Sequence, residues 1–295
     1  MKLCSIISGS SGNCVYLDTG NTRVLIDAGL SGKQLENRMK AAGLQPHALD
    51  AIFVTHEHSD HIASVGVLSR RYHIPVFATE GTWNAIGKRI GRISQAHRRV
   101  FRKEEPFAFR DMVVLPFASY HDVEDPVGYV FRTKEHKVSV LTDTGTVDEH
   151  MCEVMAGSDV YYLEANHDEY LLEIGPYPQL LKQRIRSEKG HLSNRQTANL
   201  LCNLLEGRGE QVLLGHLSEE NNTPEICYET IASALESMGW KIGQQVHLRI
   251  AGRFSPSALL DCAAPFYALP SVEERRECQE DTPVLTWQYS TAGDW

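Results

Sequence analysis

The stretch THEHSDH at residues 55–61 directly follows the apolar run AIFV and contains three histidines and one aspartate. One histidine on a turn is common, but an H-x-H-x-D-H cluster at the end of a buried strand is rare. Imidazole and carboxylate groups are usual protein ligands of divalent transition metals. A catalytic metal needs several such ligands and an open position for water. The cluster therefore predicts a metal site that other segments of the chain must complete.

Three further ionisable residues stand just past predicted strands. His121 follows VVLPFASY, Asp143 ends VSVLTD, and His216 follows VLLG. Because functional side chains converge at one edge of the sheets in α/β folds, we expect these residues to meet the 55–61 cluster. The H-x-H pair can chelate one ion, while the aspartate and histidine after it can hold a second. Asp143 is the candidate to bridge both.

The order of predicted elements indicates the fold class. Short strands with Gly-rich turns open the chain, and strands then alternate with helices in two similar halves. This pattern predicts an α/β fold in which two mixed β-sheets pack together with helices outside, a four-layer αββα sandwich. We expect residues 1–265 to form this domain. Residues 266–295 have no clear hydrophobic period, which predicts a loosely attached C-terminal tail.

Composition narrows the class of protein. The 295 residues are 42% hydrophobic and 23% charged, as in ordinary globular proteins, which argues against wholesale disorder. No apolar run approaches the ~20 residues that span a membrane, so no membrane association is expected. The N-terminus is predicted to be a first strand and not a signal peptide. Seven scattered cysteines without a C-x-x-C pair favour reduced thiols in the cytoplasm over disulfides or a cysteine-based zinc site.

The charge pattern contains evidence both against and for nucleic acid as a partner. The net charge of −9 argues mildly against nucleic acid. However, residues 88–103 carry seven Lys or Arg and no acid, and residues 182–191 carry four. Clustered cations are the usual footprint of phosphate binding. For either run alone, however, a solvated face is the favoured interpretation.

The segment THEHSDH followed in order by His121, Asp143 and His216 resembles the ligand set of the metallo-β-lactamase superfamily, over about residues 1–265. The resemblance implies the fold predicted above and two divalent ions per chain. Zinc is expected first, with manganese or iron as alternatives for His and carboxylate ligands. One ion would take His56, His58, His121 and Asp143, and the other would take Asp60, His61, Asp143 and His216.

The similarity extends to SGSSGNC, HDVEDPVGY, LTDTG, EANHD, GPYP and GHLSN, which resemble the YycJ (WalJ) branch of the superfamily. That branch comprises cytoplasmic bacterial members of nuclease type. The resemblance implies a dinuclear-metal phosphodiester hydrolase that uses a metal-bridging hydroxide, most specifically a 5′-end DNA exonuclease with ties to DNA repair. Nucleic acid, DNA above all, would then be the substrate. The segment beyond residue 265 is not part of this pattern.

Two residues match the catalytic pattern of nuclease-type relatives. These relatives carry an acidic residue and a non-ligand histidine ahead of the last ligand histidine, and Glu164 and His191 fit that order. A phosphodiester leaves as an alkoxide, so a positioned general acid assists the reaction. The resemblance implies that His191 donates the proton and that Glu164 orients it, with Asp60 counted among the catalytic residues as well as the ligands. The alternative is that His191 is a turn histidine.

Small and basic residues near the expected site are candidates for substrate binding. The Gly/Ser loop at residues 8–13 can offer backbone N–H groups to a phosphate, although a plain turn between strands explains it equally well. Three basic residues precede His191. His167 can contact metal or substrate, or cap a strand end. The candidates are Ser10, Ser11, Asn13, Arg184, Arg186, Lys189, Ser193 and His167.

Other functions compete with the nuclease hypothesis. A small-molecule cyclic phosphodiesterase of the PhnP type is favoured by the net charge, whereas the basic run at 88–103 favours a nuclease. A thioesterase shares the ligand set but needs a general acid less, because a thiolate leaves readily. A regulatory protein with a structural metal is disfavoured, since structural zinc sites are normally closed. The sequence does not predict the oligomeric state.

Overall fold

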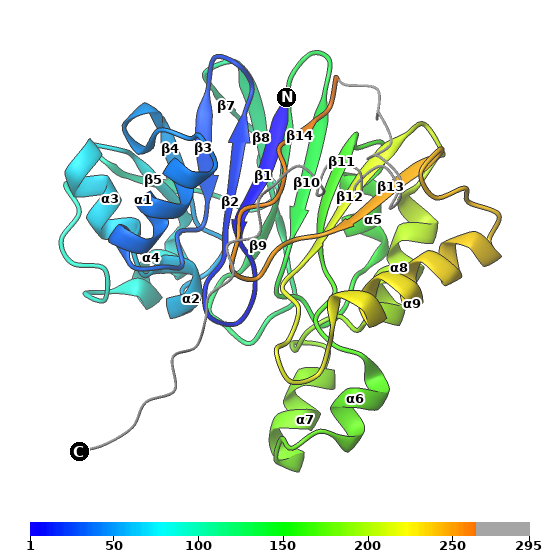
Figure 1. Cartoon of the computed structure of the whole chain (residues 1–295). Helices are drawn as coiled ribbons and strands as arrows, with labels where there is room; N and C mark the ends of the chain where they lie inside the picture. The colour runs from blue at the N-terminus through cyan, green and yellow to red at the C-terminus, as the bar shows by residue number, and fades with distance from the viewer. Residues whose placement is uncertain (264–295) are drawn as a thin grey trace, which may run out of the picture. The chain divides into compact units, whose positions relative to one another are not determined.

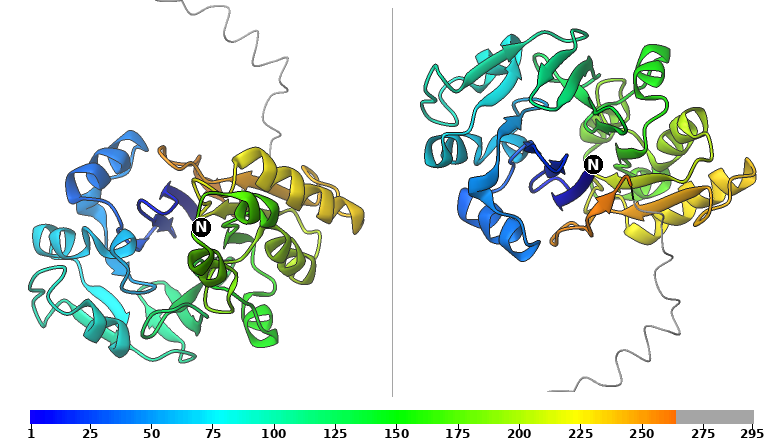
Figure 2. Two further views of the ribbon diagram at one scale, coloured as in Figure 1. Left: turned by 90° about the horizontal axis from the view of Figure 1, so that it is seen from below. Right: turned by 90° about the horizontal axis from the view of Figure 1, so that it is seen from above.

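Two seven-stranded β-sheets pack face to face in the computed structural model, with helices on their outer sides (Figures 1 and 2). The structure describes residues 1–263, and these belong to one compact unit. The predicted four-layer αββα sandwich is therefore confirmed. The predicted tail at 266–295 lies outside the described residues. No helix in the described part of the chain is long and apolar enough to cross a membrane.

The first sheet has the strand order β14-β1-β2-β3-β4-β5-β6. Strands β1 to β3 form an antiparallel meander, and β3 to β6 run parallel to one another. Its strands are β1 (Lys2–Ile7), β2 (Cys14–Asp18), β3 (Arg23–Ile26), β4 (Ala51–Phe53), β5 (Val76–Thr79), β6 (Arg98–Phe101) and β14 (Leu260–Asp261). The accompanying helices are α1 (Gly32–Ala41), η1 (Pro46–Ala48), α2 (Ser59–Ile62), α3 (Val65–Tyr72) and α4 (Glu80–Ile86).

The second sheet has the order β13-β12-β11-β10-β9-β8-β7, antiparallel from β7 to β10 and parallel from β10 to β13. Its strands are β7 (Phe107–Phe109), β8 (Met112–Ala118), β9 (Val127–Arg132), β10 (Lys137–Leu141), β11 (Val160–Glu164), β12 (Glu210–Gly215) and β13 (Val246–Ile250). The accompanying helices are α5 (Glu149–Met155), α6 (Glu169–Ile174), α7 (Gln179–Arg186), α8 (Asn194–Leu204) and α9 (Pro224–Ser237).

Apolar side chains from both sheets meet in the layer between them. Phe53 of the first sheet packs edge-on against Tyr129 and Phe131 of the second, with ring centroids 5.8 and 5.6 Å apart. Parallel strands are buried on both faces, and this explains why AIF and VYYL are continuous apolar runs. This buried layer holds the strands rigidly, and so it fixes the positions of the loops at their ends.

Sequence analysis did not predict several of these elements. Strands β6 and β7 are the outermost strands of their sheets on one side of the sandwich, and β6 falls within the basic run at 88–103. Strand β14 is the outermost strand of the first sheet on the other side. The helix pair α6–α7 is inserted between β11 and α8 and stands apart from the sheets (Figure 1). Elements this short carry too few apolar residues for a clear period. The helix pair matters because α7 leads directly to His191.

Candidate metal centre

Loops at the carboxyl ends of strands bring the predicted ligands together. The loop after β4 carries His56, and His58 is the N-cap of α2, which contains Asp60 and His61. His121, Asp143 and His216 follow β8, β10 and β12 respectively. These strands end at the same edge of the two sheets, where ligand sites form in α/β folds. Residues from both halves of the chain therefore share one site.

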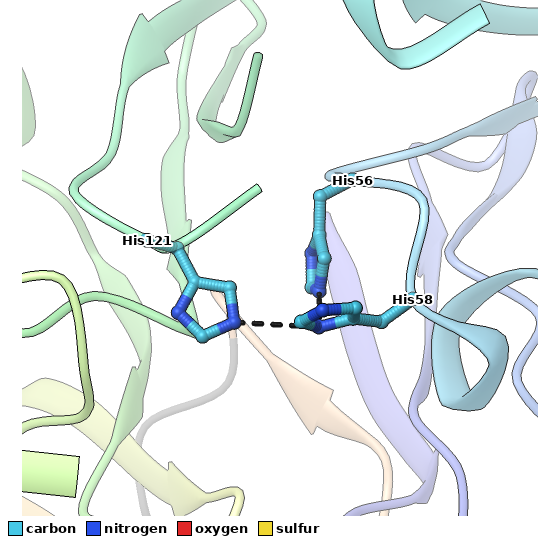
Figure 3. A group of neighbouring side chains, drawn as sticks. All are labelled: His56, His58 and His121. Atoms are coloured by element: carbon cyan, nitrogen blue, oxygen red, sulfur yellow. Dashed lines mark hydrogen bonds between the residues drawn. The ribbon is translucent and has the colours of Figure 1, made fainter. Parts of the chain in front are cut away.

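The first ligand group consists of His56, His58 and His121 (Figure 3). Nδ1 of His58 lies 3.1 Å from Nε2 of His56 and 3.4 Å from Nε2 of His121. Burial lowers the pKa of His56 well below its ordinary value, which keeps the imidazole neutral. Neutral imidazoles whose ring nitrogens lie this close together suit a divalent cation.

The second ligand group consists of Asp60, His61 and His216. Nε2 of His61 lies 3.5 Å from Oδ2 of Asp60. Nε2 of His216 is buried and has no hydrogen-bond partner among the described residues. A buried nitrogen without a partner is costly in a folded protein unless something else binds it. A cation held by this group would supply that partner.

Asp143 stands between the two groups. Its Oδ2 lies 3.3 Å from Nε2 of His61, while its Oδ1 lies 3.8 Å from Nε2 of His121. The residue is buried, has a positive φ of 54°, and its Oδ2 accepts no hydrogen bond within residues 1–263. A strained backbone and an unsatisfied carboxylate oxygen at one residue are typical of a functional position. Oδ1 also lies 3.5 Å from Nδ1 of His216, so the carboxylate is within reach of side chains of both groups.

The histidines are oriented through the ring nitrogen that faces away from the proposed ions. Nδ1 of His61 lies 2.7 Å from Oδ2 of Asp27, and Nδ1 of His216 lies 2.9 Å from Oε1 of Glu164. Nδ1 of His121 lies 3.2 Å from the main-chain oxygen of Lys189. Metal-binding histidines almost always donate their second N–H in this way. The donor set therefore fits a divalent metal.

The charge balance of the site also favours a bound cation. Burial opposes the charged form of His61, but Asp143, Asp27 and Asp60 outweigh it and raise its pKa well above the ordinary value. Burial likewise opposes the charged form of His216, whose pKa Asp143 and Glu164 nevertheless raise to about 9. The buried carboxylates thus stabilise positive charge close to them. Without a metal this charge is a proton on histidine, and a divalent ion would take the place of the proton.

His191 and Glu164 are in direct contact, as their predicted roles require. Nδ1 of His191 lies 2.7 Å from Oε1 of Glu164, and Oε2 accepts a hydrogen bond of 3.0 Å from the main-chain N–H of Thr144. Glu164 is fully buried, and its Oε1 also faces His216. One carboxylate thus orients two histidines, and sequence reasoning assigned it only the first.

A cleft of about 340 Å³ opens onto this centre. It is lined by Asp60, Asp143, His191 and His216 together with Ser10 and residues of the α6–α7 segment. A larger cavity of about 510 Å³ lies between residues 146–149 and α8, but no proposed ligand lines it. Chemistry, and not volume, therefore identifies the candidate active site.

Two of the predicted substrate-binding residues line the cleft, namely Ser10 and Arg184. Ser10 is exposed, in the loop before β2. The guanidinium group of Arg184 pairs with the carboxylate of Asp122, with Nη2 2.9 Å from Oδ1. Asn13 lies next to the centre and donates from Nδ2 to Oδ2 of Asp60 at 3.2 Å. These three side chains therefore lie beside the candidate metal centre.

The other predicted contacts are engaged elsewhere or exposed. Arg186 pairs with Glu173, and the hydroxyl of Ser193 caps α8. His167 is buried, and burial lowers its pKa to about 4. Ser11 and Lys189 are exposed, and the main-chain oxygen of Lys189 contacts Nδ1 of His121. The structure does not bring these five side chains together around one point.

Sequence reasoning missed Asp27, which directly follows β3 in LIDAG. It is buried and has a positive φ of 61°. A signal was present, because Asp27 is an ionisable residue just past an apolar strand, the same pattern that identified His121, Asp143 and His216. Its role as a partner of His61 appears only when the fold brings β3 and α2 together.

The fold and the ligand groups define a metal-dependent hydrolase with the metallo-β-lactamase fold. Residues 22–217 match the family model of the beta-lactamase superfamily domain, and the chain belongs to this superfamily as a YycJ-like member, which confirms the resemblance in the sequence. It is 39% identical over 244 residues to exodeoxyribonuclease WalJ of Streptococcus pneumoniae strain D39, covering 82% of this chain and 91% of that protein.

A second relative and a solved structure agree with this assignment. The chain is 38% identical over 239 residues to exodeoxyribonuclease YycJ of Bacillus anthracis, covering 81% of this chain and 90% of that protein. The metallo-β-lactamase fold protein YhfI of Bacillus subtilis superposes with a TM-score of 0.67 at 15% identity, covering 87% of this chain and 98% of that one. This last similarity shows the fold alone.

Proposed function

We propose that the protein is a dinuclear-metal nuclease that degrades DNA from a 5′ end. One observation carries the proposal: Asp143 lies between two ligand groups, and His191, held by Glu164 at 2.7 Å, lines the same cleft. The names of the two relatives, both exodeoxyribonucleases that match over nine-tenths of their length, support the DNA substrate.

Each of the two ligand groups is proposed to hold one ion. His56, His58 and His121 would hold one ion with Asp143, and Asp60, His61 and His216 would hold the other with the same aspartate. Zinc is proposed first, and manganese or iron also suit these ligands. When bound, two such ions supply Lewis acidity at the phosphate and an activated water.

His191 is proposed to protonate the leaving oxygen. Its Nδ1–H is fixed on Glu164, so the ring is held in one orientation and its Nε2 is the nitrogen that can donate to substrate. Glu164 is thus a positioning residue, which acts on the reaction through the imidazole. Asp60 is also proposed to be a catalytic residue. Its Oδ2 lies close to Nε2 of His61, where both would hold the same ion.

Ser10 and Arg184 are the proposed phosphate contacts, because both line the cleft. Arg184 would have to exchange part of its pairing with Asp122 for the phosphate, which a guanidinium with five N–H donors can do. We also propose a cytoplasmic location, since six cysteines are free within residues 1–263, as expected of a reducing compartment.

A small-molecule cyclic phosphodiesterase is the second candidate. The modest size of the cleft, about 340 Å³, and the net charge of −9 favour it. A thioesterase is disfavoured by the pairing of His191 with the buried Glu164, because a thiolate leaves without a general acid.

The deciding experiment compares substrates on the purified protein loaded with zinc or manganese. DNA labelled at its 5′ end, the same sequence as RNA, and a 2′,3′-cyclic nucleotide are offered in parallel. We expect the 5′ label to be released from DNA as a mononucleotide by the first cleavage, with the highest kcat/KM of the three substrates. Turnover of the cyclic nucleotide together with intact DNA would establish the second candidate instead.

A further inference from the structure

One wall of the cleft differs chemically from the rest. The metal side presents His58, Asp60 and other ionisable groups, whereas the α6–α7 segment contributes Tyr177, Leu181 and Ile185 together with Arg184. Tyr177 lies between α6 and α7, and Leu181 and Ile185 are four positions apart on α7. Side chains four apart lie on the same face of a helix. The helix pair therefore places an aromatic ring and two apolar side chains in the same cleft as the metal centre.

The exposure of these side chains separates the wall from the outer surface of the helix pair. Ile185 is buried, and Tyr177 and Leu181 are half-buried. By contrast, Tyr170 on α6 is 67% exposed and Leu180 on α7 is 81% exposed. The residues of the wall thus pack against the molecule while still lining the cleft. A cleft that combines a candidate metal centre with an aromatic ring suits a ligand that is anionic at one end and flat and apolar at the other.

We propose that this wall is a nucleobase subsite, in which the base next to the scissile phosphate stacks on Tyr177 with Leu181 and Ile185 beside it. This subsite rests on the proposed nuclease function, and it would bind the base of the substrate, whereas the metal centre would bind the phosphate. Stacking on aromatic side chains is tolerant of sequence, because every base has a π-face. The subsite would therefore hold any terminal nucleotide.

The subsite has a consequence for the class of substrate. A volume of about 340 Å³ is at the small end of ligand pockets, which favours a single nucleotide over a base pair as the occupant of the cleft. A terminal base that enters this cleft to stack on Tyr177 must therefore leave its paired partner outside. The protein should therefore prefer a single-stranded 5′ end, and a blunt duplex end must fray before it is cleaved.

The first test uses substitutions of Tyr177 in the full-length, metal-loaded protein. Tyr177→Ala should raise KM for a single-stranded DNA roughly 5- to 150-fold, the span of base–aromatic stacking, with a much smaller change in kcat. Tyr177→Phe keeps the ring and should stay near the wild-type KM. Tyr170→Ala removes an exposed tyrosine from the same helix pair and is the matched control. Unchanged metal content shows that the variants are folded.

The second test removes the base in place of the ring. A DNA whose 5′-terminal nucleotide is abasic should raise KM of the wild-type protein by about the factor seen for Tyr177→Ala. In Tyr177→Ala the abasic and ordinary substrates should then behave alike, because the partner of the base is already gone. Independent, multiplicative losses would refute the subsite while leaving the nuclease function intact. A wild-type protein that cleaves no DNA would refute the proposed function, and the subsite with it.

Discussion

The carboxylate of Asp27 lies 2.7 Å from Nδ1 of His61, and its oxygens also accept hydrogen bonds from the main-chain N–H and the hydroxyl of Thr55 at 2.8 and 2.7 Å. The ring of His61 is thereby fixed with Nε2 toward Asp60 and Asp143. Glu164 does the same for His216 from the other sheet. Each sheet thus contributes a buried strand-end carboxylate that orients a proposed ligand.

Replacing Asp27 with Ala should weaken binding of the ion assigned to His61 by about 10- to 100-fold, the usual effect of removing such an orienting partner. The ion assigned to His56, His58 and His121 should be retained. Competition with a chelator of known affinity measures both. Asp18→Ala is the control, because Asp18 pairs with Arg23 at the opposite end of β3. Equal affinity in Asp27→Ala and wild type would mean that Asp27 only anchors Thr55.

Replacing Asp143 with Ala should remove both ions or leave one weakly bound, since its carboxylate lies close to both ligand groups. Metal per chain, measured by elemental analysis after gel filtration, tests this directly. His216→Ala is the matched comparison and should lose only the second ion. Undiminished metal in Asp143→Ala would contradict the bridging assignment.

The sequence predicts the fold and most of the candidate ligands, but not the contacts that orient those ligands, and the reason is physical. His56, His121 and His216 stand out because each follows an apolar strand, and chain order alone brings such positions to one edge. Asp27 and Glu164 act through partners 34 and 52 positions away, and such pairings exist only after the sheets form. Hydrophobic periodicity reports which residues are buried, not which buried groups touch.

The wall formed by the α6–α7 pair escaped prediction for another reason. Both helices are short, at six and eight residues, and two prolines interrupt the segment between them. Such a segment resembles a polar loop in sequence. Its packing next to the centre, and with it the location of Tyr177, depends on contacts with the rest of the fold.

The basic run at 88–103 gives a prediction about DNA affinity. Arg98, Arg102 and Lys103 each pair with a carboxylate, from Glu80, Glu105 and Asp125 respectively. Reversing the charge of Lys88, Arg92 and Arg99 together should therefore weaken DNA binding most, and most strongly at low salt.

The slope of log affinity against log salt should become shallower by about 0.7 for each phosphate of single-stranded DNA that the variant no longer neutralises. Fluorescence anisotropy in a His191→Ala background, where cleavage is suppressed, measures the slope. Turnover of a small chromogenic phosphodiester should not respond to the charge reversal. An identical salt slope would assign the run to an ordinary solvated face.

His191→Ala should bind metal normally yet lose on the order of 10²–10⁴-fold in the rate of DNA cleavage, the span of general acid catalysis. The reason is geometric: Nδ1 of His191 is held by Glu164 at 2.7 Å, while the ring lines the cleft. The defect should shrink for esters of p-nitrophenol, whose leaving group needs no proton. His150→Ala is the control, because His150 lies on α5 and pairs with Glu104, and it should leave the rate unaltered.

Glu164→Gln separates the two duties of this carboxylate. It should lower the cleavage rate less than His191→Ala does, because the imidazole remains in place, but it should also weaken the ion assigned to His216, since Oε1 of Glu164 holds both rings. Rate and metal affinity are measured on the same preparation.

Equal losses of rate in His191→Ala on substrates with good and with poor leaving groups would make His191 a phosphate contact. Loss of metal in His191→Ala would make it a ligand, and the assignment of His216 would then be wrong.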